Sequence, residues 1–288
     1  MMHSQKYAMD RAIGCLVGLI AGDDNGGPTA MMMKNLGTVA HTSTLMPQYF
    51  GKGYLEWFKE DGFDAGLVTH KVLELVNSGL SFDKAAKQVD KELDGMTAGV
   101  SPAHRSIPLT LPYVAWYLRS PNFFEEFPNT GFREFQSLIR GEARLTHLHK
   151  EAGEVSQAVN AICMYLILGK DIIDSMRFGL KFINENLRLN IEDNISTRNS
   201  DNLKSGGYAP DVLTAALWFL LHTRSFEEAI KQSKAFAGVA NYCPVLVGSI
   251  GGAMYGYNEI KPYLKNISKD NIEQITLSVD SIFERIDK

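Results

Sequence analysis

Apolar residues recur at helical spacing along most of the chain. In residues 67–78 they fall at positions 68, 72, 73, 75 and 76, as expected for a helix packed along one side. No segment alternates between apolar and polar residues as a half-buried strand would. The pattern therefore predicts an all-α chain. Helices are expected over residues 12–22, 28–36, 54–58, 67–78, 81–93, 107–118, 131–143, 151–168, 171–187, 210–223, 244–256 and 270–286, with one more beginning at Ser225.

Polar and glycine-rich stretches separate these helices. Residues 37–53 are expected to be irregular, and residues 95–102 to form a turn. Residues 190–207 are the longest expected loop, and such loops in compact domains tend to be functional or disordered. No linker, repeat or low-complexity segment divides the chain. The sequence therefore predicts one domain, residues 1–288, of roughly a dozen helices.

Glycine recurs at every fourth position in two helices from opposite ends of the chain. The first carries Gly14, Gly18 and Gly22, and the second carries Gly248 and Gly252. Because glycine lowers helix propensity, a bare face of this kind favours close packing against another backbone. We expect the two helices to pack antiparallel, with the loop after the first facing the loop before the second across a cleft. The alternative is a pair of core helices whose loops are only surface turns.

These two loops carry the polar residues that suggest chemistry. Asp23 and Asp24 end the first helix, where the helix dipole disfavours negative charge. A bound cation or substrate hydroxyl would offset this cost, whereas a solvated carboxylate pair is the alternative. Asn241 and Tyr242 precede Pro244, which is expected to open the second helix. Asn241 could cap that helix or bind a hydroxyl group of a ligand.

Composition narrows the function classes. The chain has 288 residues and a net charge of −4, so it lacks the positive charge expected of a nucleic-acid-binding protein. Its longest apolar runs are too short and too rich in glycine to span a membrane. Leu19 stands where a signal peptide would carry a small residue before its cleavage site, which argues against secretion. Cys15 and Cys163 lie in apolar helical patterns and are expected to be buried free thiols in a reducing cytoplasm.

Six segments, in the order in which they occur, are typical of one enzyme family. The first reads RAIGCLVGLIAGDDNGG at residues 11–27, and the third reads TAGVSPAHRSIPL at residues 97–109. The others lie at residues 54–69, 144–158, 206–217 and 225–256. Together they make the chain resemble the ADP-ribosylglycohydrolases. The resemblance implies an all-α orthogonal bundle and hydrolysis of the bond between ADP-ribose and an acceptor, usually with two magnesium ions.

The chain departs from the family pattern at the expected metal site. Val239 and Asn241 stand where the family usually has two aspartates. The usual N-terminal Thr-Asp-Asp motif is also missing, and its nearest equivalent is Asp23 and Asp24 with Thr29 downstream. Because magnesium prefers hard oxygen ligands that include carboxylates, the expectation is at most one magnesium ion, held by Asp23 and Asp24, and no other cofactor.

The resemblance also implies a ligand cleft. Thr146 and His147 match a Thr-His-Pro motif of the family, although a lone histidine beside apolar residues is often structural. Residues 99–105 resemble a glycine-rich loop whose N–H groups could hold a diphosphate, with Arg105 contacting that phosphate or bracing the loop from behind. The expected substrate-binding residues are Asn25, Asp64, Gly99, Ser101, His147, Gly207, Tyr208, Asn241 and Tyr242.

The resulting hypothesis is a cytoplasmic hydrolase that cleaves a ribose glycosidic bond in an ADP-ribosylated substrate or a related N-riboside. Asp23 and Asp24 are the expected catalytic residues, stabilising an oxocarbenium-like transition state, orienting water or holding magnesium. The partner would be a small molecule containing ADP-ribose or a modified protein, with no nucleic acid and no membrane. One alternative is an inactive ADP-ribose or nucleotide binder, supported by Val239 and Asn241. Another is a structural protein, as in the lens crystallins related to this family.

Overall fold

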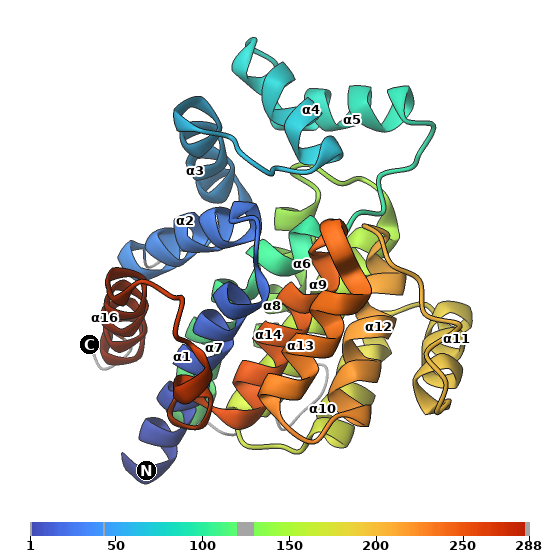
Figure 1. The fold of residues 1–288 in the computed structure, drawn as a ribbon. Helices are drawn as coiled ribbons and strands as arrows, with labels where there is room; N and C mark the ends of the chain where they lie inside the picture. The colour runs from blue at the N-terminus through green and yellow to red at the C-terminus, as the bar shows by residue number, and fades with distance from the viewer. Residues whose placement is uncertain (1, 43, 120–129, 286–288) are drawn as a thin grey trace.

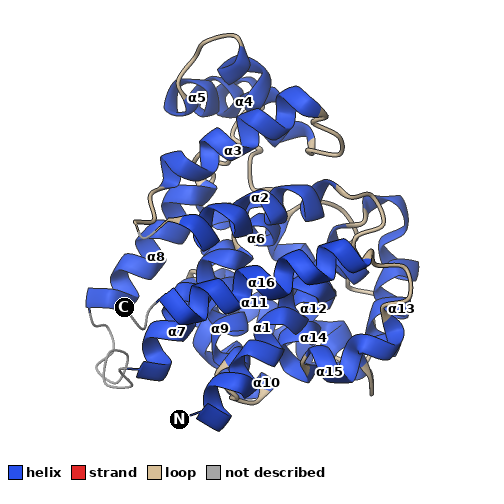
Figure 2. Ribbon diagram, turned by 90° about the vertical axis from the view of Figure 1, so that its left-hand side faces the viewer, coloured by secondary structure: helices blue, strands red, loops and turns tan. Residues whose placement is uncertain are grey.

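Every regular element of the described residues is helical (Figures 1 and 2). The computed structural model describes residues 2–42, 44–119 and 130–285, and there it confirms the all-α prediction. The α-helices are α1 (Met2–Gly22), α2 (Gly27–His41), α3 (Pro47–Glu60), α4 (Leu67–Asn77), α5 (Phe82–Glu92), α6 (Ser101–Arg105), α7 (Thr110–Arg119), α8 (Thr130–Ala143), α9 (Lys150–Ile167), α10 (Ile172–Gly179), α11 (Glu185–Ser196), α12 (Ala209–His222), α13 (Phe226–Ala237), α14 (Tyr242–Tyr255), α15 (Tyr257–Ile260) and α16 (Lys269–Arg285). None of these helices is long and apolar enough to cross a lipid bilayer.

The two glycine-striped helices, α1 and α14, pack against each other at the centre of the protein (Figure 1). Gly14 meets the backbone of Gly252, and Gly18 meets that of Gly248, so the helices run antiparallel as predicted. Gly22 lies against the backbone of Pro244. A Cβ atom at Gly14, Gly18 or Gly22 would overlap the partner's backbone. The stripe therefore exists because the two helix backbones touch.

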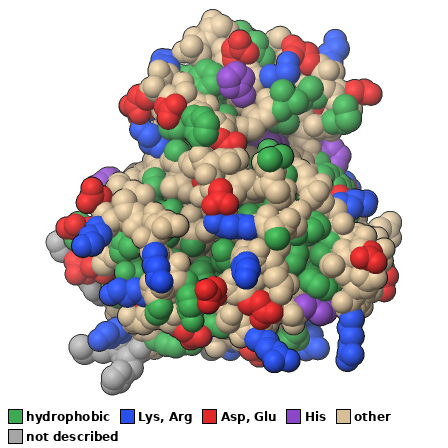
Figure 3. Space-filling view, in the orientation of Figure 1, with side chains coloured by type: hydrophobic (Ala, Val, Ile, Leu, Met, Phe, Trp, Pro, Cys, Tyr) green, Lys and Arg blue, Asp and Glu red, His purple; other side chains and the backbone are tan. Residues whose placement is uncertain are grey.

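The remaining helices cover this central pair. Helices α9, α12 and α13 pack against α14, while α16 packs against α1 and α2. Helices α4 and α5 project from the main body and pack on each other around their own small apolar cluster of Val72, Ala85, Ala86 and Val89. Figure 3 shows the surface narrowing between this projection and the main body, and shows acidic and basic side chains mixed over the same face.

The expectation that residues 37–53 are irregular is wrong. Helix α2 continues through Gly37 to His41 because Val39 and Ala40 are buried against the core. Helix α3 begins at Pro47, and it continues through Gly51 because the ring of Phe82 packs on that glycine. The packing of a buried apolar face stabilises a helix by more than a single glycine destabilises it.

The predicted helix over residues 171–187 and the long loop after it are also wrong. The chain forms α10, a short 3₁₀ turn and then α11, whose residues 190–196 lie within the loop expected over residues 190–207. Asn184 caps α11 by accepting a hydrogen bond from the backbone N–H of Leu187 at 3.1 Å. Only Ile191 and Ile195 of α11 are buried. Because the rest of the helix is mostly polar, its sequence lacks the apolar periodicity that would have predicted it.

Candidate functional site

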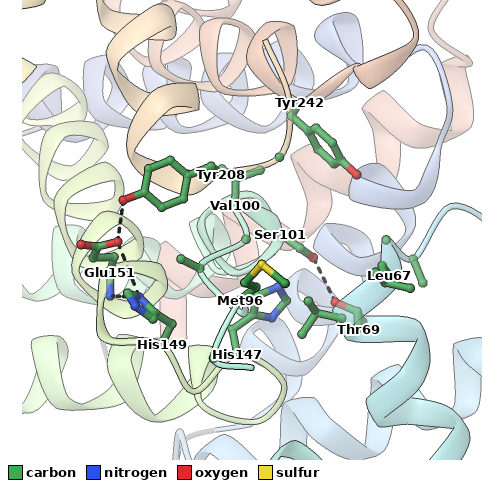
Figure 4. A pocket seen from close by; sticks show the side chains of 17 residues that line it. Leu67, Thr69, Met96, Val100, Ser101, His147, His149, Glu151, Tyr208 and Tyr242 are labelled. Atoms are coloured by element: carbon green, nitrogen blue, oxygen red, sulfur yellow. Dashed lines mark hydrogen bonds and ion pairs between the residues drawn. The ribbon is translucent and has the colours of Figure 1, made fainter. Parts of the chain in front are cut away.

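A pocket of about 570 Å³ lies at the junction between the α4–α5 projection and the main body (Figure 4). Its volume is within the range of small-molecule sites in proteins. Six of the nine predicted binding residues line it: Gly99, Ser101, His147, Gly207, Tyr208 and Tyr242. The pocket is lined by residues 65–69, Gly95, Met96, residues 98–101, His147, His149, Glu151, Gly207, Tyr208 and Tyr242.

Two loops that are distant in sequence meet along one wall of the pocket. The backbone N–H of Val100 donates to the carbonyl of Gly207 at 3.0 Å, and that of Ala209 donates to the carbonyl of Ala98 at 2.8 Å. A Cβ atom at Gly99 would lie 2.7 Å from His147 Nε2, so glycine allows this loop to pack on the histidine. The predicted meeting of the glycine-rich loop with residues 206–208 is therefore present.

His147 is held neutral by its surroundings. Its Nδ1 lies 2.7 Å from the hydroxyl of Thr146, which accepts a hydrogen bond from Arg105 Nη2 at 2.9 Å. Because Thr146 already accepts from Arg105, its hydroxyl proton is available to Nδ1, which favours the tautomer with N–H at Nε2 on the pocket side. Burial, followed by the positive charge of Arg105, lowers the pKa of His147 well below its usual value.

Arg105 braces the pocket from behind and is not among the residues that line it. Its side chain is fully buried and forms an ion pair with Glu142, with Arg105 Nε 2.7 Å from Glu142 Oε1. The same carboxylate oxygen accepts a hydrogen bond of 2.6 Å from the hydroxyl of Tyr54. Of the two roles considered for Arg105, the structure supports bracing.

Tyr208 closes one side of the pocket through a contact that the sequence did not suggest. Its hydroxyl donates to Glu151 Oε2 at 2.7 Å, and His149 Nδ1 lies 3.6 Å from the same oxygen (Figure 4). Burial and the hydrogen bond to Glu151 raise the pKa of Tyr208. Glu151 and His149 were missed as site residues. The available signal was an acidic residue in the first turn of α9, which is a common helix feature and points to no ligand.

Asp64 lies beside the pocket, immediately before the lining residue Ala65. Its backbone has φ 54°, in the left-handed region that non-glycine residues rarely adopt. Partial burial and the charge of Asp23 raise the pKa of Asp64, while hydrogen bonds from the Gly27 backbone and the Asn25 side chain act in the opposite direction. The charge of Asp64 in turn adds to burial in raising the pKa of Tyr242. A carboxyl group with a raised pKa therefore faces the predicted binding residues Asn25 and Tyr242.

The loop of Asp23 and the loop of Asn241 meet as predicted, but the cleft expected between them is not there. Asn241 Nδ2 donates to Asp23 Oδ1 at 2.8 Å, and Asn241 Oδ1 accepts from the backbone N–H of Asp24 at 3.0 Å. These bonds close the gap directly. Tyr242 reaches the pocket, whereas Asp23, Asp24 and Asn241 do not line it.

Helix α14 begins two residues earlier than predicted, at Tyr242 instead of Pro244. Asn241 precedes the helix in the left-handed conformation without capping it through its side chain. Pro244 therefore lies within the first turn, two residues after the start of the helix. The side chain of Asn241 is engaged with the end of α1 and is not available to cap α14 or to contact a ligand in the pocket.

Comparison with known proteins adds independent information. A family described as ADP-ribosylglycohydrolase matches residues 30–288. The chain is 27% identical over 143 residues to the ADP-ribosylarginine hydrolase Tri1 of Serratia proteamaculans (strain 568), covering 49% of this chain and 38% of that protein. It is 24% identical over 121 residues to the enzyme of the same name from Pseudomonas putida (strain GB-1), covering 42% of this chain and 33% of that protein. These matches thus span well under half the length of either relative.

A solved structure described as an ADP-ribosylglycohydrolase-related protein complex has the same fold. Its TM-score to this chain is 0.73 at 22% sequence identity. The superposition covers 97% of this chain and 99% of the other.

Proposed function

The chain belongs to the ADP-ribosylglycohydrolase family, and on that premise we propose that it binds the ADP-ribosyl group of a modified substrate in the pocket and hydrolyses the glycosidic bond of the ribose. The observation that supports this most directly is the position of Asp64. Its carboxyl group has a raised pKa and lies beside a pocket of about 570 Å³. A raised pKa favours the protonated form of the carboxyl group, which is the form that a general acid needs.

In the proposed reaction, the bond between the ribose C1 atom and the acceptor breaks with its electron pair leaving on the acceptor. Asp64 donates a proton to that leaving atom, and a water oxygen bonds to C1, which has oxocarbenium character in the transition state. The proton released by the water restores the Asp64 carboxyl group. Asp23 contributes through its charge, which raises the pKa of Asp64, so it is a positioning residue in this proposal.

The remaining pocket residues would bind and orient the substrate. His147 would present a neutral N–H donor to a phosphate or hydroxyl oxygen. Tyr208 and Tyr242 offer aromatic surfaces for a base or ribose, and the backbone around Gly99 and Ser101 could contact the diphosphate. These roles supply binding and orientation, which are large contributions to catalysis in their own right.

The first substrate to test is a peptide carrying ADP-ribosylated arginine, because both named relatives are ADP-ribosylarginine hydrolases. Release of ADP-ribose is followed with the wild type and with Asp64→Asn, which keeps the shape of the side chain but removes the titrating proton. We expect kcat to fall by about 100-fold or more, with binding of ADP-ribose largely kept. Asp61→Asn makes the same change at an exposed carboxylate of the same loop that does not line the pocket, and should leave kcat near that of the wild type. An Asp64→Asn enzyme with unchanged kcat would exclude the proposed role of Asp64.

A second candidate function is binding of ADP-ribose without turnover. It is favoured by Val239, which is 99% exposed and offers no ligand oxygen, and by Asn241, whose amide replaces a carboxylate of the family pattern. Calorimetric binding of ADP-ribose, together with no release from ADP-ribosylated arginine, serine or simple nucleosides, would support this candidate.

We propose a reducing, cytoplasmic location for the protein. Cys15, Cys163 and Cys243 are free and buried, as expected for Cys15 and Cys163. Free buried thiols are typical of proteins that work in reducing compartments.

A further inference from the structure

We propose that the corner formed by Asp23, Asp24, Lys234 and Asn241 is a metal-free clasp, in which an amide and an ammonium group take the positions that a cation would need. We call these four residues the acidic corner. The proposal concerns how the ends of α1 and α14 are joined. It does not depend on whether the chain hydrolyses a substrate, because its test uses only the protein and a metal ion.

Asp23 already has a full set of hydrogen-bond donors. Its Oδ1 accepts from the backbone N–H groups of Asn25 at 3.1 Å and Gly26 at 2.9 Å, and from Asn241 Nδ2 at 2.8 Å. Its Oδ2 accepts from the backbone N–H of Thr29 at 2.8 Å and from the Thr29 hydroxyl at 2.7 Å. A carboxylate offers about four lone-pair sites, so these five donors leave no oxygen free for a metal ion.

The orientation of the Asn241 side chain is fixed from both ends. Its oxygen accepts from the Asp24 N–H, and its nitrogen donates to Asp23. Rotating the amide by half a turn would place its NH₂ group against an N–H and its oxygen against a carboxylate, so only one orientation satisfies both contacts. The amide hydrogen atoms therefore point at Asp23, where they carry the partial positive charge that a cation would otherwise bring.

Asp24 is neutralised separately. Its Oδ1 lies 2.5 Å from Lys234 Nζ, and Lys234 comes from α13, which packs against α14. Val239, the other departure from the family pattern, points into solvent and supplies no side-chain oxygen. In the part of the chain that the structure describes, no three His, Cys, Asp or Glu residues gather in a way that could hold a metal ion. The residues present at this corner therefore do not fit the magnesium ion expected from the family resemblance.

The clasp has a consequence for the pocket because Tyr242 directly follows Asn241. Asn241 is only 4% exposed and adopts φ 54°, which asparagine tolerates better than most residues. Fixing Asn241 to the end of α1 therefore sets where α14 begins and where the ring of Tyr242 enters the pocket.

The test measures the thermal unfolding midpoint in EDTA and in Mg²⁺ at matched ionic strength, with calorimetric titration of Mg²⁺ into the same protein. For the wild type we expect equal midpoints and no binding heat. Asn241→Asp keeps the tolerated backbone conformation but replaces the amide donor by a carboxylate facing Asp23. We expect its midpoint in EDTA to fall by about 5 °C or more because of charge repulsion, and to recover on addition of Mg²⁺. Asn194→Asp is the matched control, since it adds the same charge at a half-buried position on α11, outside the acidic corner.

Three outcomes would overturn the proposal. One is stoichiometric binding of Mg²⁺ by the wild type below about 1 mM, and this measurement requires no variant to fold. Another is an Asn241→Asp variant as stable as the wild type in EDTA. The third is an Asn241→Asp midpoint that responds to Mg²⁺ no more than that of Asn194→Asp.

Discussion

At the scale of single residues, the pocket depends on polar side chains that lie entirely inside the protein. Arg105 is fully buried, and its guanidinium connects Glu142 on one side with Thr146 and His147 on the other. Such a buried ion pair contributes little net stability, because desolvation of the charges offsets their attraction. Its effect here is geometric, since Arg105 holds the Thr146 hydroxyl against the His147 ring; burial first, and then the charge of Arg105, lower the pKa of that ring.

His104 makes the stability of the protein depend on pH. Its ring is fully buried against Tyr242, and Nε2 donates to the Tyr242 carbonyl at 3.1 Å. Burial lowers the pKa of His104 to about 4, although the charge of Asp23 and this hydrogen bond act in the opposite direction. Because the folded pKa lies below the unfolded value of about 6.5, the unfolded chain takes up the proton first as pH falls. The contribution to stability is therefore complete above about pH 6.5 and is lost towards pH 4.

We expect the loss to reach about 3 kcal/mol at pH 4, and His104→Gln should remove most of this dependence. Urea unfolding of the wild type and the variant at pH 7.5 and pH 4.5 measures it. Carboxylates that titrate in this range affect the free energy of unfolding of both proteins equally, so the difference in pH dependence between the two proteins reports His104 alone. Equal pH dependence in the two proteins would contradict the assignment.

At the scale of elements, α1 and α14 hold the two halves of the site in register. Their backbones touch at three successive glycines of α1, which sets the relative position of the two helices to within one turn. That register brings Asp23 next to Asn241, and thereby Asp64 and Tyr242 next to the pocket. The site therefore depends on the glycines of this interface, because a side chain at any of them would push the two helices apart.

Gly18→Ala tests the importance of this contact. The added methyl group would overlap the backbone carbonyl of Gly248, which cannot move without separating the helices. We expect a loss of about 1–3 kcal/mol in the free energy of unfolding, measured with urea. Gly37→Ala is the matched control, because its methyl group would enter open space within α2. The control should raise stability by about 0.5–1 kcal/mol, since alanine favours helix more than glycine does. A Gly18→Ala protein as stable as this control would show that the helices can separate without cost.

At the scale of the whole molecule, the pocket lies where two apolar clusters meet. The main core contains α1, α9, α12 and α14, whereas α4 and α5 surround their own small cluster. The pocket is lined from both sides of this boundary, by residues 65–69 on the projecting side and by His147 and Tyr242 on the other. A ligand that fills it would contact both clusters and reduce their independent motion.

Hydrogen–deuterium exchange with and without ADP-ribose measures this coupling. We expect slower exchange of the backbone N–H groups in residues 65–69, 98–101 and 206–209, because bound ligand stabilises the state in which both walls are in place. At a ligand concentration of 100 times Kd the added stability would be about 2.7 kcal/mol. Helix α16, none of whose residues lines the pocket, serves as the internal reference. Protection confined to α16, or absent from all three segments, would contradict the proposed binding site.

The sequence by itself determined the helical class, most helix positions and the pairing of α1 with α14. These follow from local periodicity and from glycine spacing, which depend only on residues a few positions apart. It also identified Gly99, Ser101, His147, Gly207, Tyr208 and Tyr242, which the structure brings to one pocket. Helix α11 was missed, because only two of its residues are buried and local pattern is weak there.

Only the tertiary structure decided what each polar side chain contacts. Asp23 was expected to face an open cleft, but its donors include Thr29, six positions away, and Asn241, 218 positions away. Glu151 is part of the pocket wall because it accepts a hydrogen bond from Tyr208, which is 57 positions away in the sequence. Spacing along a chain specifies the face of a helix on which a side chain lies. Whether a carboxylate there is free, paired or saturated with donors depends on groups that only the folded backbone brings within hydrogen-bond distance.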